Sequence, residues 1–333
     1  MEKITLGVLD QSHVRRNGTA AEALQESGKL AQYVEQLGYT RFWVSEHHNF
    51  KGIAGTSPEV LIPWLASQTK TIKIGSGGIM LPNHSSLKVA ENFGILSSLF
   101  PGRIDLGIGR APGTDRLTSH VLNPSNTFSE KEFYHQLLEL QAYIYHDEVQ
   151  DSVHEKVRAF PKADIPPDFW ILTSSGGSAQ FAAAFGMSLA LAYFISPEGG
   201  EDIVEFYKHN FKPSEYQQKP KVIVAIFAFC SENQSEIDDW ITEFDYRLLH
   251  IESGATGGLP SVEEIRKFPY SIQHLARINA NKGRYIVGKP NEVADKIKKL
   301  AHKTEADEIM IATITDDFIA RKKSYELIAG QLL

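Results

Sequence analysis

The sequence predicts a (β/α)8 TIM barrel, because eight short apolar runs alternate with segments of helical period along its 333 residues. Several runs are almost continuously apolar, as is typical of parallel strands buried on both faces. Polar residues follow the ends of four runs, namely Asp10-Gln11, Glu46-His47-His48, Gly109-Arg110 and Ser174-Ser175-Gly176-Gly177-Ser178. Since the parallel strands of a barrel end at one face, we expect these groups to meet at a single site.

The expected elements follow from period and from turn residues. Strands are expected over residues 4–9, 40–45, 72–80, 104–109, 168–173, 187–193, 221–229 and 307–312. Helices are expected over residues 20–37, 57–70, 85–99, 127–147, 178–185, 199–212, 232–249, 290–304 and 316–331. Gly38 closes the first helix, and Ser57 with Pro58 opens the second as an N-cap followed by proline at the first helical position.

Three segments are longer than a minimal barrel needs. Residues 110–126 follow the fourth strand, 148–167 precede the fifth, and 250–287 lie between the seventh and eighth. Long segments in compact domains often bind ligands or cover sites. Because residues 253–258 are glycine-rich, we expect 250–287 to form a mobile lid. No repeat or linker divides the chain, so one domain with these inserted loops is expected over 1–333.

Composition excludes several classes of function. The net charge of −7 argues against binding to nucleic acid or to an anionic membrane, since both need clustered Lys and Arg. No apolar stretch approaches the roughly 20 residues of a membrane span, and the N-terminus lacks the features of a signal peptide. Cys230 has no partner for a disulfide and is expected to be an inert buried thiol. A cytoplasmic protein is expected.

Arg110 is a candidate anion ligand, because its planar guanidinium favours phosphate and stays charged. The alternative is a surface arginine paired with Asp115 or another acid. The serines and glycines of 174–178 open a helix, where backbone N–H groups favour an anion. They are equally consistent with an N-cap and a glycine turn, and the commoner phosphate site of barrels follows strands seven and eight.

The segment Gly75-Ser76-Gly77-Gly78 is too rich in glycine for an ordinary central strand. Either a flat ligand approaches its backbone or it forms a bulge. His47 and His48 are unsuited to one metal ion, since neighbouring side chains of a strand point to opposite faces. His47 is a candidate general acid or base or a structural histidine, and His48 is expected to pack.

Two further polar pairs lie at expected strand ends, Asp10-Gln11 after the first and Asn83-His84 after the third. Their side chains suit binding to a ligand or to the backbone of the neighbouring loops. The residues alone leave both functions open.

The chain resembles the bacterial luciferase-like family of flavin-dependent monooxygenases over most of its length. Four segments in order carry the resemblance: Phe42 to His48, Gly75 to His84 with Ala90-Glu91, Gly102 to Arg110, and Ala306 to Ile311. The resemblance implies that reduced FMN lies across the barrel mouth and reacts with O2. The resulting flavin C4a-hydroperoxide then oxygenates a small organic substrate.

The resemblance also assigns residues. It implies that Arg110 and the loop of Ser174, Ser175, Gly176, Gly177 and Ser178 bind the FMN phosphate. The peptide between Gly77 and Gly78 would be cis beneath the flavin ring, and His47 would assist proton transfer. Gly109 stands where luciferases proper have a reactive cysteine, so light emission and specificity for long-chain aldehydes are not expected.

The alternatives are an F420-dependent oxidoreductase, which belongs to a branch of the same family, and a flavin-binding protein without turnover. A divalent-metal hydrolase would need converging ligands that the sequence does not offer, so no metal is expected. Gly107-Ile108-Gly109 lacks the full dinucleotide-binding spacing, so a separate NAD(P)H:flavin reductase is expected to supply reduced FMN. Relatives pair through their second and third helices, which implies a homodimer.

Overall fold

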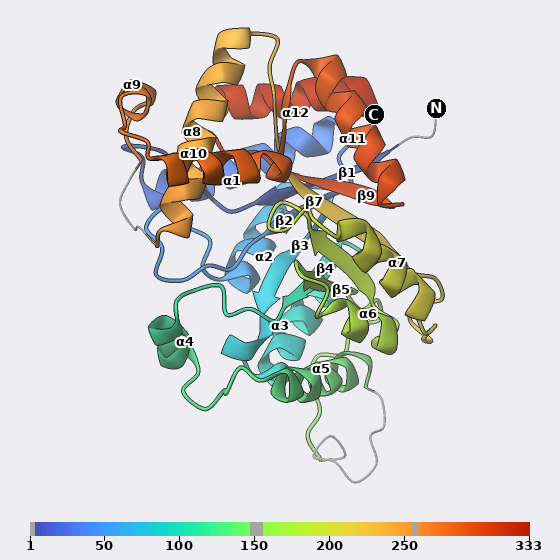
Figure 1. Ribbon diagram of the computed structural model, residues 1–333. Helices are drawn as coiled ribbons and strands as arrows, with labels where there is room; N and C mark the ends of the chain where they lie inside the picture. Colours follow the sequence, from blue (N-terminus) through green and yellow to red (C-terminus); the bar gives the residue numbers. More distant parts are fainter. Residues whose placement is uncertain (1–3, 147–155, 255–258) are drawn as a thin grey trace.

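The computed structural model describes residues 4–146, 156–254 and 259–333, which form a parallel barrel surrounded by helices (Figure 1). Eight strands close the ring in the order β1, β2, β3, β4, β5, β6, β7, β9, and β9 pairs with β1. Their bounds are β1 Thr5–Asp10, β2 Arg41–Val44, β3 Lys73–Met80, β4 Ile104–Gly109, β5 Asp168–Thr173, β6 Ser188–Ala192, β7 Val222–Cys230 and β9 Glu308–Ala312. The expected barrel is thereby confirmed.

Helices connect the strands on the outside of the barrel (Figure 1). They are α1 Ala20–Gln36, α2 Pro58–Gln68, α3 Ser86–Leu99, α4 Arg116–Leu122, α5 Glu130–Tyr145, α6 Ala179–Phe185, α7 Gly200–Asn210, α8 Gln234–Glu252, α9 Val262–Arg266, α10 Ile272–Asn281, α11 Pro290–Lys303 and α12 Phe318–Leu332. Alternate strand residues face these helices and the barrel axis, so the strands are buried on both sides. Leu6 and Val8 of β1, for example, pack in the outer layer, and Leu9 packs inside.

The expectation of a loop over 250–287 is wrong in part. α8 extends to Glu252, and α9, α10 and the short 3₁₀ helix Lys282–Arg284 follow. β8, Tyr285–Gly288, then pairs in parallel with the end of β7. Of the glycine-rich stretch, residues 255–258 lie outside the described part of the chain, and the role of this segment as a lid stays a prediction.

The structure also describes part of the other two insertions. Residues 110–126 contain α4, whose first turn is capped by Asp115. Within 148–167, residues 148–155 lie outside the described part of the chain. A cis peptide joins Phe160 and Pro161 in the remainder.

A buried cluster of charges fills the N-terminal end of the barrel. Arg41 donates to Asp105 Oδ2 at 2.7 Å and to Glu308 Oε2 at 2.8 Å, and its guanidinium lies 4.8 Å from the ring of Trp170. Burial raises the pKa of both carboxyl groups. Burial alone would lower the pKa of Arg41, but the two acids raise it. Because this end is filled, a ligand must enter at the opposite face.

Replacing Arg41 with Met should destabilise the fold by about 3–5 kcal/mol, since it leaves buried Glu308 without its counter-charge and Asp105 with the more distant Lys73. Urea unfolding at neutral pH measures this loss. Arg266→Met is the matched control, because Arg266 pairs with Asp239 on the surface and should contribute less than about 1 kcal/mol. Equal losses for the two variants would show that the cluster does not stabilise the barrel.

Candidate functional site

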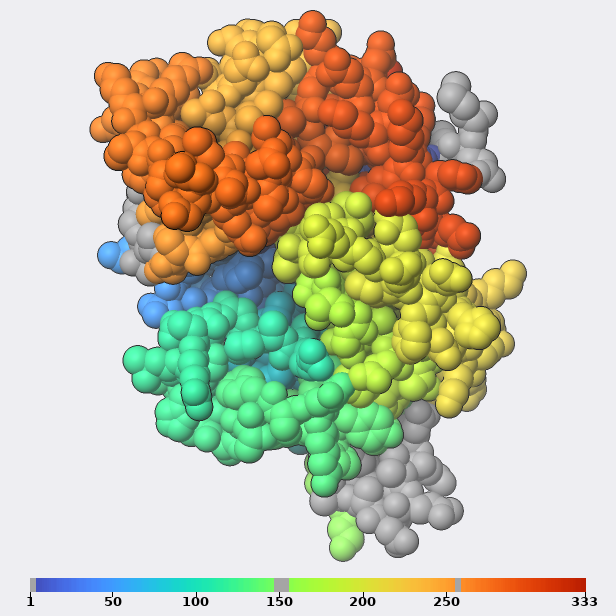
Figure 2. All heavy atoms as spheres, viewed as in Figure 1, coloured from blue at the N-terminus to red at the C-terminus, as the bar shows by residue number. Residues whose placement is uncertain are grey.

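Two adjoining cavities open at the C-terminal ends of the strands. The larger cavity has a volume of about 530 Å³ and the smaller one about 210 Å³. Gln11, His47, Phe194 and Ile195 line both, so the cavities meet at these residues. Figure 2 shows a hollow in the surface between the orange segment that contains α9 and α10 and the green segment that contains α4.

The smaller cavity has a polar end formed by Arg110 and the loop 174–178. Arg110 follows β4, and a Cβ on Gly177 would lie 3.0 Å from Arg110 Nη2, so the loop passes close to the guanidinium and a side chain at 177 would make Arg110 shift slightly. Within the described residues, neither the side chains of Ser174, Ser175 and Ser178 nor the backbone N–H of Gly177 make a hydrogen bond. The structure thus brings the two expected anion-binding elements together, with donors available.

Neither Asp115 nor Glu130 forms a strong ion pair with Arg110. Asp115 does not pair with it, since its carboxylate accepts from the backbone N–H groups of Leu117 and Thr118 at 3.0 Å. Glu130 Oε1 lies 3.7 Å from Arg110 Nη1, and the Glu130 side chain is more than half exposed. An exposed pair of this kind contributes little, so Arg110 can exchange it for an anion.

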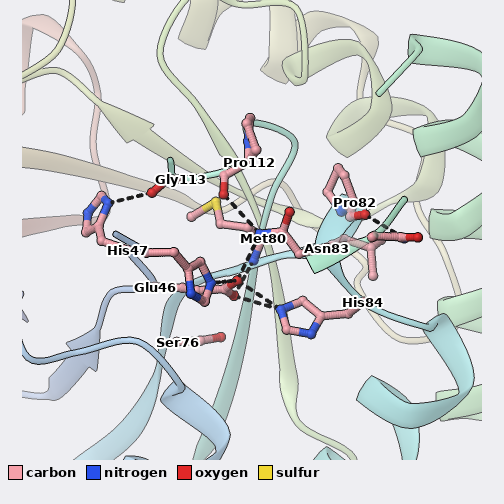
Figure 3. Close-up of polar contacts among 12 residues, drawn as sticks. Glu46, His47, Ser76, Met80, Pro82, Asn83, His84, Pro112 and Gly113 are labelled. Carbon is pink, nitrogen blue, oxygen red and sulfur yellow. Dashed lines mark hydrogen bonds and ion pairs between the residues drawn. The ribbon is translucent and has the colours of Figure 1, made fainter. Parts of the chain in front are cut away.

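Glu46 is the centre of a buried hydrogen-bond network (Figure 3). Its carboxylate accepts from the backbone N–H of Met80 at 2.8 Å, from Asn83 Nδ2 at 3.1 Å, and from Nε2 of His48 and His84 at 2.8 and 2.9 Å. Burial would raise the pKa of Glu46, but these donors lower it to about 2. A carboxylate with four donors fixes the ends of β2 and β3 relative to each other.

The network assigns hydrogen-bond partners to His48, Asn83 and His84, which the sequence alone does not give. His48 is not merely a packing residue, because it donates a hydrogen bond to Glu46. Asn83 also donates to the carbonyl oxygen of Pro112 at 2.9 Å, which ties the loop after β4 to the network (Figure 3). Burial lowers the pKa of His84, but the hydrogen bond with Glu46 and the negative charges of Glu46 and Glu59 together outweigh it, and the net shift is upward.

His47 points away from this network and lines both cavities (Figure 3). Its Nδ1 lies 3.4 Å from the carbonyl oxygen of Gly113, and its Nε2 lies 3.5 Å from Gln11 Nε2. A carbonyl can only accept, so Nδ1 carries the proton and Nε2 presents its lone pair. Burial lowers the pKa of His47, which favours this neutral form at pH 7. A neutral imidazole in this tautomer can accept a proton at Nε2.

The peptide bond between Gly77 and Gly78 is cis, and the pairing of β3 with β4 shifts register here. Close packing against other residues of the barrel explains why glycine occupies both positions. A Cβ on Gly77 would lie 2.9 Å from the ring of Trp43, and one on Gly78 would lie 2.7 Å from the carbonyl oxygen of Gly107. Gly77 also lines the smaller cavity. The composition of β3 is therefore required by packing inside the barrel as well as by its place at the cavity.

Asp10 does not reach the cavities. It is fully buried and pairs with Arg321 at 2.8 Å, whereas the next residue, Gln11, lines both cavities. Cys230 is buried at the end of β7, and burial raises the pKa of its thiol to about 12. A thiol with this pKa is protonated at neutral pH and unreactive.

Sequence reasoning missed most of the larger cavity. Its wall is formed largely by apolar side chains and by two arginines from α8 and the segment before β8: Phe50, Ile53, Phe194, Phe227, Phe244, Arg247, Leu248, Ile251, Arg284 and Ile314. Helix α8 and the loop after β6 contribute many of them, and neither shows a motif. Only the fold reveals that they share a cavity.

Within residues 4–146, 156–254 and 259–333, no group of three or more His, Cys, Asp or Glu side chains is arranged to hold a metal ion. In the same ranges, no helix is both long and apolar enough to cross a membrane.

A family model described as luciferase-like monooxygenase matches residues 4–308. The chain belongs to this family. Two relatives from Bacillus subtilis (strain 168) are an uncharacterized protein, YwcH, 43% identical over 98% of each chain, and N-acetyl-S-alkylcysteine monooxygenase, 34% identical over 99% of this chain and 98% of the relative. Family membership supports an oxidoreductase.

Solved structures agree with the family and the fold. Apo-MsnO8 has a TM-score of 0.87 and 31% identity, and the match covers 99% of both chains. Two more distant structures are similar in fold. The oxygenating constituent of 3,6-diketocamphane monooxygenase from Pseudomonas putida, in complex with FMN, has a TM-score of 0.73 at 20% identity over 99% of this chain and 98% of that one. An F420-dependent secondary alcohol dehydrogenase has a TM-score of 0.72 at 13% identity over 100% of both chains.

The shifted pKa values around Glu46 predict a pH dependence of stability. The pKa of Glu46 falls from 4.5 to about 2 on folding, so its stabilisation is complete above pH 4.5 and is lost as the pH falls to 2. The pKa of His84 rises above 6.5, so its contribution is complete below pH 6.5 and is lost as the pH rises through the raised value.

Glu46→Gln should therefore lower the free energy of unfolding at pH 6 by about 2–4 kcal/mol and flatten its change between pH 4.5 and 2. Denaturant unfolding across this pH range measures both effects. Glu263→Gln, at an exposed glutamate of α9, is the control and should change neither. A variant at Glu46 with the wild-type pH profile would contradict the assignment.

Proposed function

We propose that the protein is a flavin-dependent monooxygenase that uses reduced FMN and O2 to oxygenate a small organic substrate. The observation that carries the proposal is the pair of adjoining cavities. The smaller one ends in a set of anion donors, the larger one is mainly apolar, and His47 lines both. This arrangement suits a phosphorylated cofactor beside an organic substrate, with an acid–base group between them.

The residues of the smaller cavity fit FMN. Arg110 and the donors of 174–178 would hold its phosphate, and the flavin ring would lie against Gly77 and Gly78. The glycine at 177 supports this fit, because a side chain there would crowd Arg110. When bound, reduced FMN would supply the electrons that activate O2.

The chain's own residues would control protons and water. His47 Nε2 would accept or return a proton at the place where the two cavities meet, and Gln11 would keep its ring oriented by donating to it. The apolar wall of the larger cavity would exclude water from the reacting groups, which favours oxygen transfer over side reactions.

The two alternatives have less support from the geometry. F420 has a longer polyanionic tail than FMN. Among the residues that the structure describes, the smaller cavity offers Arg110 as its one lining arginine or lysine, with Glu130 beside it. A flavin-binding protein without turnover would not need the larger cavity, which adjoins the first and is large enough for a substrate.

The partners follow from the same proposal. A separate NAD(P)H:flavin reductase would supply reduced FMN, since Gly107-Ile108-Gly109 lacks the full dinucleotide-binding spacing and the described residues form one barrel. The proposal further includes a homodimer and a cytoplasmic location.

Titration of the purified protein with oxidised and reduced FMN, FAD and F420, followed by rapid mixing of the reduced complex with O2, tests the proposal. Selective binding of reduced FMN and flavin oxidation coupled to oxygenation of an added substrate are expected. Preference for F420 and no reaction with O2 would favour hydride transfer instead.

Arg110→Ala should weaken FMN binding by about 2–3 kcal/mol and leave riboflavin binding nearly unchanged, because riboflavin lacks the phosphate. Fluorescence titration of both flavins measures the difference. Arg116→Ala, at an exposed arginine on α4, removes the same charge and should affect neither flavin. Equal losses for FMN and riboflavin would contradict a phosphate site at Arg110.

His47→Ala should lower the rate of coupled oxygenation by about 10²–10⁴-fold, as is typical of losing a general acid or base. The dissociation constant for FMN should stay within a few-fold. His48→Ala is the control, since His48 binds Glu46, and it should mainly lower stability. Unchanged turnover of the His47 variant on a verified substrate would exclude this role.

A further inference from the structure

The larger cavity contains an arginine whose donors are not used. Arg247 of α8 is 8% exposed and lines this cavity. Its Nη2 lies 3.7 Å from Glu243 Oε1 and 3.7 Å from Asp316 Oδ1, beyond hydrogen-bond distance. The guanidinium makes no hydrogen bond to any part of the chain that the structure describes. A guanidinium has five N–H donors, and Arg247 lines the cavity, so a ligand there can accept hydrogen bonds from it.

Both acids also pair with Arg16, and Asp316 pairs with His13 as well. Arg16 Nη2 lies 3.1 Å from Glu243 Oε1 and 3.1 Å from Asp316 Oδ2. The charges of Arg16 and Arg247 therefore balance those of the two acids, while the N–H donors of Arg247 remain available. Burial lowers the pKa of Arg247, whereas the nearby charges of Glu243 and Asp316 act in the opposite direction.

Arg284, the other arginine that lines the cavity, differs from Arg247 in this respect. Its Nε donates to the carbonyl oxygen of Phe194 at 2.7 Å, and its Nη1 donates to Glu252 Oε1 at 2.6 Å. Glu252 in turn accepts from Arg277 at 2.6 Å. The charged groups at this side of the cavity are thus already paired.

The rest of the wall is apolar. Aromatic rings from the loop after β6, from β7 and from α8 pack against one another, with centroids 4.5 Å apart for Phe194 and Phe227 and 5.0 Å apart for Phe227 and Phe244. Leu248 and Ile314 extend this surface. A ligand here would bury an apolar body on these rings.

We propose that the larger cavity binds a substrate with an apolar body and one carboxylate, and that Arg247 receives the carboxylate. The proposal rests on the proposed function for the reaction, but binding can be measured apart from it. A planar carboxylate matches the guanidinium fork with two parallel hydrogen bonds. A single negative charge is favoured over a phosphate dianion, since Glu243 and Asp316 lie beside the arginine. Phe194 and His47 line both cavities, so a substrate held at Arg247 can extend to the flavin side.

Isothermal titration calorimetry with 4-phenylbutanoate and 4-phenylbutanamide tests the proposal. The two probes share a shape and differ in charge. The purified protein, with and without saturating FMN, should bind the acid about 10- to 100-fold more tightly than the amide. Arg247→Gln should abolish this preference and leave the affinity for the amide unchanged.

Two further variants make the result decisive. The double variant Glu243→Gln with Arg247→Gln keeps the charge of the cluster balanced, and it should lose the preference in the same way even if the single variant does not fold. Arg266→Gln removes an equal charge from the surface of α9 and should keep the preference.

Equal affinities for the two probes, no binding of the acid, or a preference that survives in both variants at Arg247 would overturn the proposal. Failure of the proposed function has a different signature. If FMN does not bind but the acid preference depends on Arg247, the carboxylate site stands and the monooxygenase assignment is wrong.

Discussion

The buried carboxylate of Glu46 is the constraint on which the mouth of this barrel depends. It sits at the end of β2 and accepts hydrogen bonds from the end of β3, from two histidines and from Asn83. A charge that is fully removed from water is tolerated only when donors surround it. Once these donors are in place, the backbone around Glu46 is fixed, and His47, the next residue, is directed into the cavities.

The two ends of the barrel use buried charge in different ways. At the N-terminal end, Arg41 and its two acids fill the interior and close it. At the C-terminal end, Glu46 accepts hydrogen bonds from residues at the ends of neighbouring strands and in the loops that follow them, and it does not fill the interior of the barrel. Buried, paired charges therefore close the barrel at its N-terminal end. At its C-terminal end they fix the residues that surround the two cavities.

Much of the fold could be predicted from the sequence, because buried parallel strands leave nearly continuous apolar runs. The groups at strand ends, such as Arg110 and His47, could also be found, since topology alone brings them to one face. β8 was missed because it is four residues long and follows directly on helical segments. Arg247 was missed because it lies in the middle of α8, where its sequence context is that of an ordinary amphipathic helix.

The position of Glu46 at the centre of a hydrogen-bond network could not be derived from the sequence either. Its partners at positions 80, 83 and 84 are distant along the chain, and only the register between β2 and β3 brings them within hydrogen-bond distance. The same holds for the cavities, whose walls combine loops after β1, β2, β4 and β6 with α8. Local pattern indicates which residues are polar at a strand end, but packing decides which of them point inward.

In the proposed enzyme, one cavity would hold FMN and the other would hold the substrate, with His47 between them. A crystal structure of the protein with FMN tests this most directly. The phosphate is expected between Arg110 and the loop 174–178, the flavin ring against Gly77 and Gly78, and the larger cavity still open beside His47. An FMN phosphate bound elsewhere, or a flavin ring that fills the larger cavity against Phe227 and Phe244, would contradict it.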